Sequence, residues 1–283
     1  MKIRADNRTR KKSNKWGKII RRILLIIFCL FSIFPCIWMI IISLKERIYT
    51  YDPSKWLFPP TLENYVKVFR ERNLGPYFFN SIIVSALNCL ISVILGSITA
   101  YGLARYKFKR SETTAFFLLA IRMLPPMGIV IPFFVIATLL RITDTRLILI
   151  ICYMIFNIPF ATWMMRGFFE DIPREIEEAA KVDGCSTLQT LRKVVVPLAM
   201  PGLVATSIFC VINAWNEFVY ALFLTSFRAM TIPTIVQVFL SVSGIIWGEM
   251  CAVGTISTLP ILIFALIVQK NMIRGLTFGA VKG

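Results

Sequence analysis

The sequence contains no histidine, and acidic residues are scarce, with 15 Asp and Glu against 32 Lys and Arg. Without histidine, a Ser-His-Asp triad, imidazole acid–base chemistry and the commonest metal ligand are all excluded. The seven cysteines include no C-x-x-C spacing, which argues against a disulfide framework and a zinc site. No G-x-x-x-x-G-K-[ST] loop is present to cradle a nucleotide phosphate. We therefore predict no catalytic residue, no metal and no cofactor, and we expect a protein that is not an enzyme.

The net charge of +17 comes in large part from the first 22 residues. A basic arm of this kind can bind nucleic acid, but Lys and Arg next to an apolar run also fix the orientation of a membrane span and attract anionic lipid. The next residues are strongly apolar, so we interpret residues 1–22 as a basic cytoplasmic arm that contacts the lipid bilayer. We predict no nucleic-acid partner.

Hydrophobic residues make up 57% of the chain and charged residues only 17%, which indicates an integral membrane protein. A helix needs about 20 apolar residues to cross the bilayer. Six runs of about this length are present, and they predict an all-α permease domain over residues 23–283, with spans at about 23–44, 77–103, 115–140, 147–169, 203–224 and 250–268. The first run is too long for a cleaved signal peptide. Pro125, Pro126 and Pro132 predict that the third span is kinked or broken.

Orientation follows from the basic residues, because Lys and Arg near span ends resist translocation. They concentrate in the N-terminal arm, the connection between the second and third spans, the loop at 170–202 and the tail at 269–283. We therefore expect both termini and the 170–202 loop to be cytoplasmic.

The polar loop at 170–202 predicts two short helices that meet at a glycine. Asp171, Glu175 and Glu178 recur at spacings of four and three, which places them on one acidic stripe of a helix. Ile172, Ile176 and Ala179 form an apolar stripe beside it. A helix with this pattern suits a groove on a soluble partner, where small side chains permit close approach and Glu178 can meet a basic group.

The second half of the loop has its own start and stop signals. Gly184 provides a turn that a side chain would hinder, and Ser186 with Gln189 has the spacing of a capping box. We expect the second helix to run through Lys193 and the pattern to end at Pro197. The alternative is a solvated hairpin that binds nothing.

The segment at 51–76, on the outer side, contains a further helical pattern. Leu62, Tyr65, Val66 and Phe69 follow Thr61 at helical spacing, which predicts an amphipathic helix. Such a helix can lie on the outer membrane face or cap the bundle, and both interpretations stay open.

Polar residues inside the spans are candidates for a translocation path. On a continuous fifth span, Asn213, Asn216 and Glu217 share one face, with Trp215 on another. Arg122 lies just before the prolines of the third span. A charge at bilayer depth costs at least about 2.5 kcal/mol, so these groups should face protein or water. They could line a path for a polar solute or hold helices together. We expect Asn80, Asn88 and Asn157 to be structural hydrogen-bonding residues.

One set of motifs recurs in order along the chain. The sequence E-A-A-x-x-x-G at 178–184 is followed after nine residues by V-x-V-P at 194–197, and further matches are Trp215-Asn216-Glu217-Phe218, Thr231-Ile232-Pro233, Trp247-Gly248-Glu249 and the end of the chain from Gly275 to Gly283. Together they resemble the second permease subunit of maltose-type carbohydrate importers, which are ATP-binding-cassette (ABC) transporters. The usual ending of the loop motif is I-x-L-P, so this chain departs from it at two positions.

The resemblance implies a function and a set of partners. It implies a prokaryotic inner-membrane permease of an ATP-driven importer, working by alternating access with a second, non-identical permease subunit, an ATPase dimer and an extracytoplasmic solute-binding protein. The residues that would couple to the ATPase are Glu175, Glu178, Ala179, Ala180, Gly184 and Pro197. The tail that would reach between the ATPase subunits comprises Gly279, Ala280, Val281, Lys282 and Gly283.

Two other function classes compete with the importer. A secondary transporter would need an ion-coupling carboxylate or an inverted repeat, and a membrane-embedded enzyme would need a convergent nucleophile and base. Neither pattern is evident in the chain. The sequence leaves open which sugar or polar solute is carried.

Overall fold

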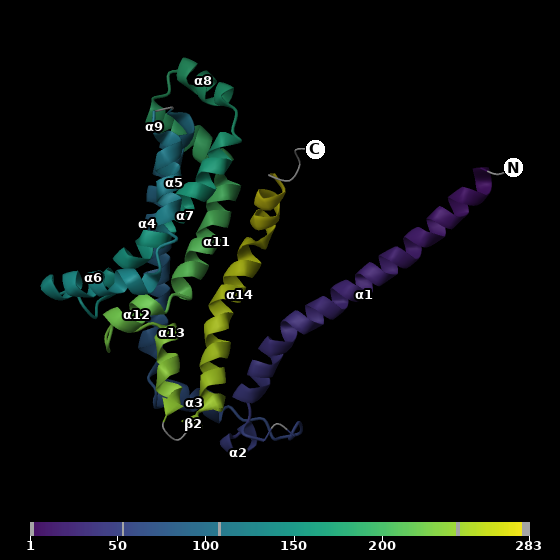
Figure 1. Cartoon of the computed structure of the whole chain (residues 1–283), viewed down its shortest axis with the longest axis vertical. Coiled ribbons are helices and arrows are strands. Elements are labelled where there is room, and N and C mark those ends of the chain that lie inside the picture. The colour runs from purple at the N-terminus through teal and green to yellow at the C-terminus, as the bar shows by residue number, and fades with distance from the viewer. Residues whose placement is uncertain (1–2, 53, 107–108, 242–243, 279–283) are drawn as a thin grey trace.

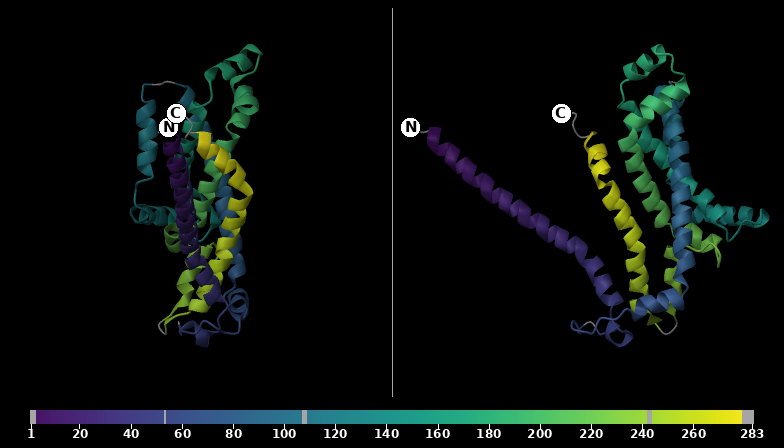
Figure 2. Two further views of the ribbon diagram at one scale, coloured as in Figure 1. Left: turned by 90° about the vertical axis from the view of Figure 1, so that its right-hand side faces the viewer. Right: turned by 180° about the vertical axis from the view of Figure 1, so that it is seen from behind.

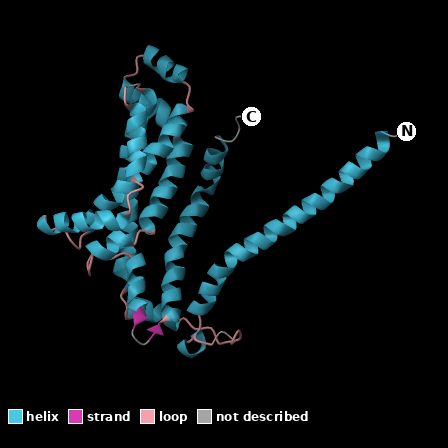
Figure 3. Cartoon of the chain, in the orientation of Figure 1, coloured by secondary structure: helices cyan, strands magenta, loops and turns pink. Residues whose placement is uncertain are grey.

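The computed structural model describes residues 3–52, 54–106, 109–241 and 244–278, and within these ranges the protein is almost entirely helical (Figures 1 and 3). A two-stranded antiparallel hairpin pairs β1 (Leu240–Ser241) with β2 (Gly244–Ile245). The helices are α1 (Ile3–Ser43), α2 (Arg47–Thr50), α3 (Glu63–Arg70), α4 (Leu74–Arg105), α5 (Ser111–Ile121), α6 (Pro126–Leu139), α7 (Arg146–Glu170), α8 (Arg174–Val182), α9 (Thr187–Thr190), η1 (Leu191–Val195), α10 (Val196–Leu198), α11 (Met200–Trp215), α12 (Val219–Leu224), α13 (Ile232–Ile235), η2 (Val236–Phe239) and α14 (Trp247–Phe278).

Four helices in the described part are long and apolar enough to cross a membrane, namely α4, α7 and the stretches Trp16–Ser43 of α1 and Trp247–Ile267 of α14. Two further helix pairs pass the same test but are sharply bent, which raises the number to six when each bent pair counts as one span. The all-helical membrane fold is therefore confirmed, although several of its spans are irregular.

The third span is broken, as the prolines predict. Helices α5 and α6 meet at an angle of 86°, and the break falls immediately before Pro126. Pro125 has extended backbone angles, and Pro126 starts α6 at the position where a missing N–H costs nothing. Pro132 lies inside α6 without ending it. As a result, α6 lies crosswise to the long helices and extends to one side of the bundle (Figure 1).

The prediction of a continuous fifth span was wrong. Helix α11 ends at Trp215, residues 216–218 are not helical, and α12 begins at Val219. The carboxylate of Glu217 accepts hydrogen bonds from the backbone N–H groups of Val219, Tyr220 and Ala221 at 2.9–3.4 Å. It thereby supplies acceptors to the first turn of a new helix, which is why the chain restarts there.

The core of the bundle lies where α4, α7 and α11 pack together. Gly96 of α4 touches α7 so closely that a Cβ at this position would lie 2.6 Å from the Cβ of Ala161. Buried amides link the three helices: Asn157 donates to the Oδ1 of Asn88 at 2.6 Å and to the carbonyl of Cys210 at 3.0 Å. These contacts confirm the structural role of the two asparagines. Asn80 likewise holds the loop after α12, through the carbonyls of Arg228 and Met230.

Helix α1 stands away from the bundle over most of its length (Figures 1 and 2). It approaches α14 near its C-terminal end, where Met39 covers Gly254. The residues predicted as a basic arm continue the same helix from Ile3 onward. The beginning of α1, helix α8 and the last turns of α14 all lie at one end of the molecule, which we call the α8 end (Figure 1).

Helix α3 lies at the opposite end and confirms the helix predicted there, but three of the four residues of its apolar stripe point outward, and Tyr65 is the one that packs against the core. Asn64 and Val68 are buried, whereas Leu62, Val66 and Phe69 are exposed. The inward face is fixed by Asn64, whose amide donates to the carbonyls of Ser43 and Lys45 at the end of α1. Contacts of α3 with α4 and α14 make this helix a cap on the bundle.

Asp144 links the loop between α6 and α7 to the loop that follows α12. Its carboxylate accepts hydrogen bonds from four consecutive backbone N–H groups, those of Ser226, Phe227, Arg228 and Ala229. Burial by itself would raise the pKa of Asp144, but the hydrogen bonds from these N–H groups hold it below its ordinary value. The ionised carboxylate is thus part of the folded structure.

We expect Asp144→Asn to lower the unfolding temperature of the protein at neutral pH, because a neutral amide oxygen accepts these bonds more weakly, a loss of about 1 kcal/mol. The pKa of Asp144 is depressed, so its stabilisation is present above the ordinary value of 3.8 and is lost as the pH falls through the lower folded value. Thermal unfolding from pH 3 to pH 8 checks this, with the exposed Asp183→Asn as the control. Equal unfolding temperatures at pH 7 would contradict the role of Asp144.

Candidate coupling hairpin and central cavity

The loop at 170–202 forms the predicted helical hairpin and projects beyond the bundle at the α8 end (Figure 1). Gly184 has a φ of +85°, a conformation that favours glycine, and it makes the turn after α8. The capping box of Ser186 and Gln189 is present at the start of α9. One detail was wrong: the chain stays helical through η1 and α10 to Leu198, because Pro197 falls in the first turn of α10, where a missing N–H is tolerated.

One face of the hairpin is open to solvent. Glu175, Glu178, Ala179 and Gly184 are exposed, and so are two large apolar side chains, Val182 at 88% and Leu188 at 73%. We call Glu178, Ala179, Val182 and Leu188 the hairpin surface. Apolar side chains this exposed on a projecting, charged element are typical of a docking site for another protein.

The other face of α8 is anchored to α4 by a buried ion pair that sequence reasoning missed. Glu177 is 4% exposed and accepts hydrogen bonds from Arg105 Nε at 2.5 Å and from the hydroxyl of Tyr101 at 2.7 Å. Arg105 also donates to the carbonyl of Ile172, at 2.9 Å. We call Tyr101, Arg105 and Glu177 the α4–α8 clamp.

The clamp determines which face of α8 lies against the bundle. Of the apolar stripe that was predicted to suit a partner's groove, Ile172 is buried within this chain, whereas Ile176 and Ala179 are exposed. The residues of α8 that are buried are Glu177 and Ala180. A charged residue was not expected on this face, and the only sequence signal for it was an arginine, Arg105, at the end of the second span.

The four polar residues predicted inside the spans meet in one cavity of about 330 Å³. Arg122, Asn213, Asn216 and Glu217 all line it, together with apolar and aromatic residues that include Phe156 and Tyr220. The cavity lies at the two helix breaks, between α5 and α6 and between α11 and α12. Broken helices around a polar cavity are how many transporters form a solute site within the membrane. We call this the central cavity.

The lining residues have different partners. Glu217 caps α12, Asn213 donates to Oδ1 of Asn157 at 3.3 Å, and Asn216 donates to the carbonyl of Ile212 at 2.9 Å. Arg122 lies over the ring of Phe160, with its guanidinium carbon 4.6 Å from the ring centre. Arg122 and Asn216 are exposed in the single chain, so within a membrane they must face water or another protein.

Neither the hairpin nor the central cavity resembles a catalytic centre. Within the described ranges, no three His, Cys, Asp or Glu side chains gather closely enough to hold a metal ion. The predicted tail residues, from Gly279 to Gly283, lie outside the described residues.

A membrane-spanning helical bundle with a projecting hairpin, and with broken spans around a cavity that contains polar side chains, defines a membrane transport protein. Residues 92–278 match the family model of the binding-protein-dependent transport system inner membrane component, and the chain belongs to this family. It is therefore a permease subunit of a multi-pass inner-membrane ABC importer, in which ATP hydrolysis is the task of a separate subunit.

Relatives cover nearly the whole chain. The trehalose/maltose transport system permease protein MalG of Thermococcus litoralis is 36% identical over 274 residues, which are 94% of this chain and 99% of that protein. The sulfoquinovosyl glycerol transport system permease protein SmoH of Agrobacterium fabrum is 35% identical over 94% of this chain and 95% of its own length.

The fold is also known from a crystal structure. A chain of a bacterial ABC transporter involved in the import of the acidic polysaccharide alginate matches with a TM-score of 0.75 and 24% identity. The match covers 92% of this chain and 98% of that chain.

Proposed function

We propose that this chain is one of two non-identical permease subunits of an importer that translocates a carbohydrate or a related polar solute. The relatives transport trehalose and maltose in one case and sulfoquinovosyl glycerol in another, which supports a polyhydroxylated solute. An extracytoplasmic binding protein would deliver it at the α3 end. The α8 end would be cytoplasmic, in agreement with the concentration of Lys and Arg there.

The hairpin surface carries this proposal, because it projects from the α8 end and its apolar side chains Val182 and Leu188 are strongly exposed. It would lie in a groove of the ATPase subunit, where Glu178 would pair with a basic residue. Closure of the ATPase dimer on ATP would move the hairpin, and the clamp would pass the movement to α4. The spans would then change from inward-open to outward-open.

The second permease subunit would cover what a single chain leaves exposed at membrane depth. Arg122 and Asn216 need water or protein around them, and a path between two subunits provides both. Helix α1, which stands free of the bundle, offers a further surface for this partner. The central cavity would then be part of the translocation path.

The end of the chain would take part in the ATPase contact. Helix α14 runs to Phe278 at the α8 end, so Gly279 to Gly283 follow directly from it. We propose that this tail reaches between the ATPase subunits.

We expect Glu178→Lys to reduce recruitment of the ATPase and solute uptake at least tenfold, because it reverses the charge offered to the groove while changing nothing that is buried. Co-purification of the ATPase with the tagged permease, and uptake into vesicles, measure the two effects. The matched control is Glu71→Lys, the same charge reversal at an exposed site on the α3 end. Normal recruitment and normal uptake by Glu178→Lys would contradict the proposed coupling.

A further inference from the structure

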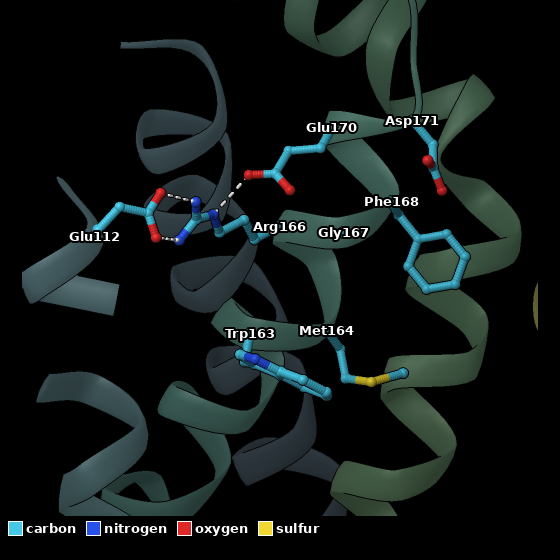
Figure 4. A pocket seen from close by; sticks show the side chains of 8 residues that line it. All are labelled: Glu112, Trp163, Met164, Arg166, Gly167, Phe168, Glu170 and Asp171. Atoms are coloured by element: carbon cyan, nitrogen blue, oxygen red, sulfur yellow. Dashed lines mark hydrogen bonds and ion pairs between the residues drawn. The ribbon is translucent and has the colours of Figure 1, made fainter. Parts of the chain in front are cut away.

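A second cavity, of about 480 Å³, lies along α7 near the α8 end. It is lined by Glu112 of α5 and by residues of the last two turns of α7 with the residue that follows, namely Trp163, Met164, Arg166, Gly167, Phe168, Glu170 and Asp171. Figure 4 shows Trp163, Arg166 and Glu170 on one side of α7 and Phe168 on the side that faces the neighbouring helix. The cavity therefore lies between α5 and the end of α7, and Phe168, one of its lining residues, lies against Gly202 of α11. We call it the α7 cavity.

The α7 cavity and the central cavity are aligned along the same helix. Phe156 lines the central cavity and Trp163 lines the α7 cavity, and the step of seven residues from one to the other corresponds to two helical turns, or about 10 Å. Both cavities are lined by residues of α5 and α7. Phe160 lies between the two positions on α7, and Arg122 covers its ring at 4.6 Å. The contact of Arg122 with Phe160 therefore stands between the two cavities.

The side chains of the α7 cavity suit a sugar. Trp163 is 55% exposed, which leaves a large aromatic surface free to cover the apolar face of a pyranose ring. Arg166 donates to Glu170 at 2.7 Å and is also paired with Glu112 (Figure 4). This cluster offers both donors and acceptors to hydroxyl groups, and its opposite charges balance in part, so it does not select strongly for an ion.

We propose that the α7 cavity is the exit segment of the translocation path, where a polyhydroxylated solute passes from the central cavity toward the cytoplasm, and that the contact of Arg122 with Phe160 separates the two segments. The inference rests on the proposed function, since it requires an importer of such a solute. It assigns to Trp163 a contact with the solute and to Arg166 the hydrogen bonds that replace water during exit.

Gly167 provides a reporter for this cavity. A Cβ built at Gly167 meets no atom within 4 Å, so Gly167→Cys should fit without disturbing the helix. Its matched comparison is Asn216→Cys in the central cavity, and Ser54→Cys on the exposed α3 end is the control for the reagent. Of the native cysteines, the four that are not buried would be replaced, and Cys89, Cys152 and Cys210, which are buried, would stay.

The experiment uses the complete importer with its ATPase and binding protein in vesicles, and a small charged methanethiosulfonate that can reach both sides. Uptake of trehalose, maltose and glucose first identifies an imported sugar, which becomes the probe. We expect Gly167→Cys to react several times faster without nucleotide than with trapped ATP, and the imported sugar to slow the reaction at least threefold. Adding Trp163→Ala should remove this protection, whereas adding Trp163→Phe should keep it.

The outcomes separate the inference from the proposed function. If the importer takes up none of these sugars and Glu178→Lys has no effect on ATPase recruitment, the proposed function fails and the inference fails with it. If a sugar is imported and Asn216→Cys depends on nucleotide, but Gly167→Cys is unreactive in both states, the α7 cavity faces lipid and the inference is wrong. Equal reactivity of Gly167→Cys in both states, without protection by the sugar, would show that the α7 cavity is ordinary solvent-exposed surface. The inference would then be wrong.

Discussion

Replacing Glu177 with alanine should lower the unfolding temperature of the permease by several degrees and release the hairpin from α4. The carboxylate is 4% exposed, and its loss leaves the guanidinium of Arg105, whose side chain is only 9% exposed, without its charged partner. Removing one member of a buried ion pair costs about 3–5 kcal/mol, since the remaining charge is uncompensated. The loss of stability should therefore exceed that of Asp144→Asn, where a weaker acceptor still remains.

Two further variants distinguish the clamp from a general loss of stability. Replacement of both members by methionine, Arg105→Met with Glu177→Met, leaves no unpaired charge and should recover most of the unfolding temperature. The exposed neighbour Glu178→Ala should leave it unchanged. Thermal unfolding of the purified complex measures all three, and a Glu177→Ala protein that unfolds at the wild-type temperature would show that the clamp contributes nothing.

The second large effect is expected at Glu217, the carboxylate that starts α12. Glu217→Ala removes the acceptor for the N–H groups of Val219, Tyr220 and Ala221, and inside a membrane little else can accept those hydrogen bonds. We expect uptake to fall more than tenfold, because α12 loses its place beside α6 and the wall of the central cavity is displaced.

Glu217→Gln tests whether the cap or the charge is what matters. Its amide oxygen can still accept from the first turn of α12, so a capping role predicts that uptake is largely retained, while a requirement for the negative charge predicts loss equal to that of Glu217→Ala. Initial rates of uptake into vesicles, normalised to the amount of assembled complex, provide the measurement. Full activity of Glu217→Ala would contradict both roles.

The helical membrane fold and the hairpin could be predicted from the sequence because their signals are local. Apolar runs of about 20 residues identify the spans, prolines mark the break before α6, and Gly184 with the Ser186 capping box marks the hairpin. Each of these signals depends only on residues that are close together in the sequence, so a single sequence is enough to find it.

Two of the errors have a common cause, which is that side chains bind partners far away in the sequence. Glu177 turns inward because Arg105 and Tyr101 of α4 meet it there, and α3 turns its polar Asn64 inward because the carbonyls at the end of α1 need donors. Helical periodicity alone ranks residues by polarity and would place both outside. The fifth span broke for a local reason instead, since the carboxylate of Glu217, which periodicity assigns to a helix face, accepts hydrogen bonds from backbone N–H groups only two to four residues ahead.

Coupling of sugar movement to an ATPase through the hairpin surface is the central claim. The most direct measurement is a disulfide or bifunctional cross-link between Val182→Cys and cysteines placed along the groove of the ATPase, combined with ATP-driven sugar uptake by the same vesicles. We predict that the cross-link forms in the assembled importer, that it is absent in Glu178→Lys, and that uptake is lost in parallel. A cross-link that never forms while uptake proceeds at the normal rate would contradict the claim.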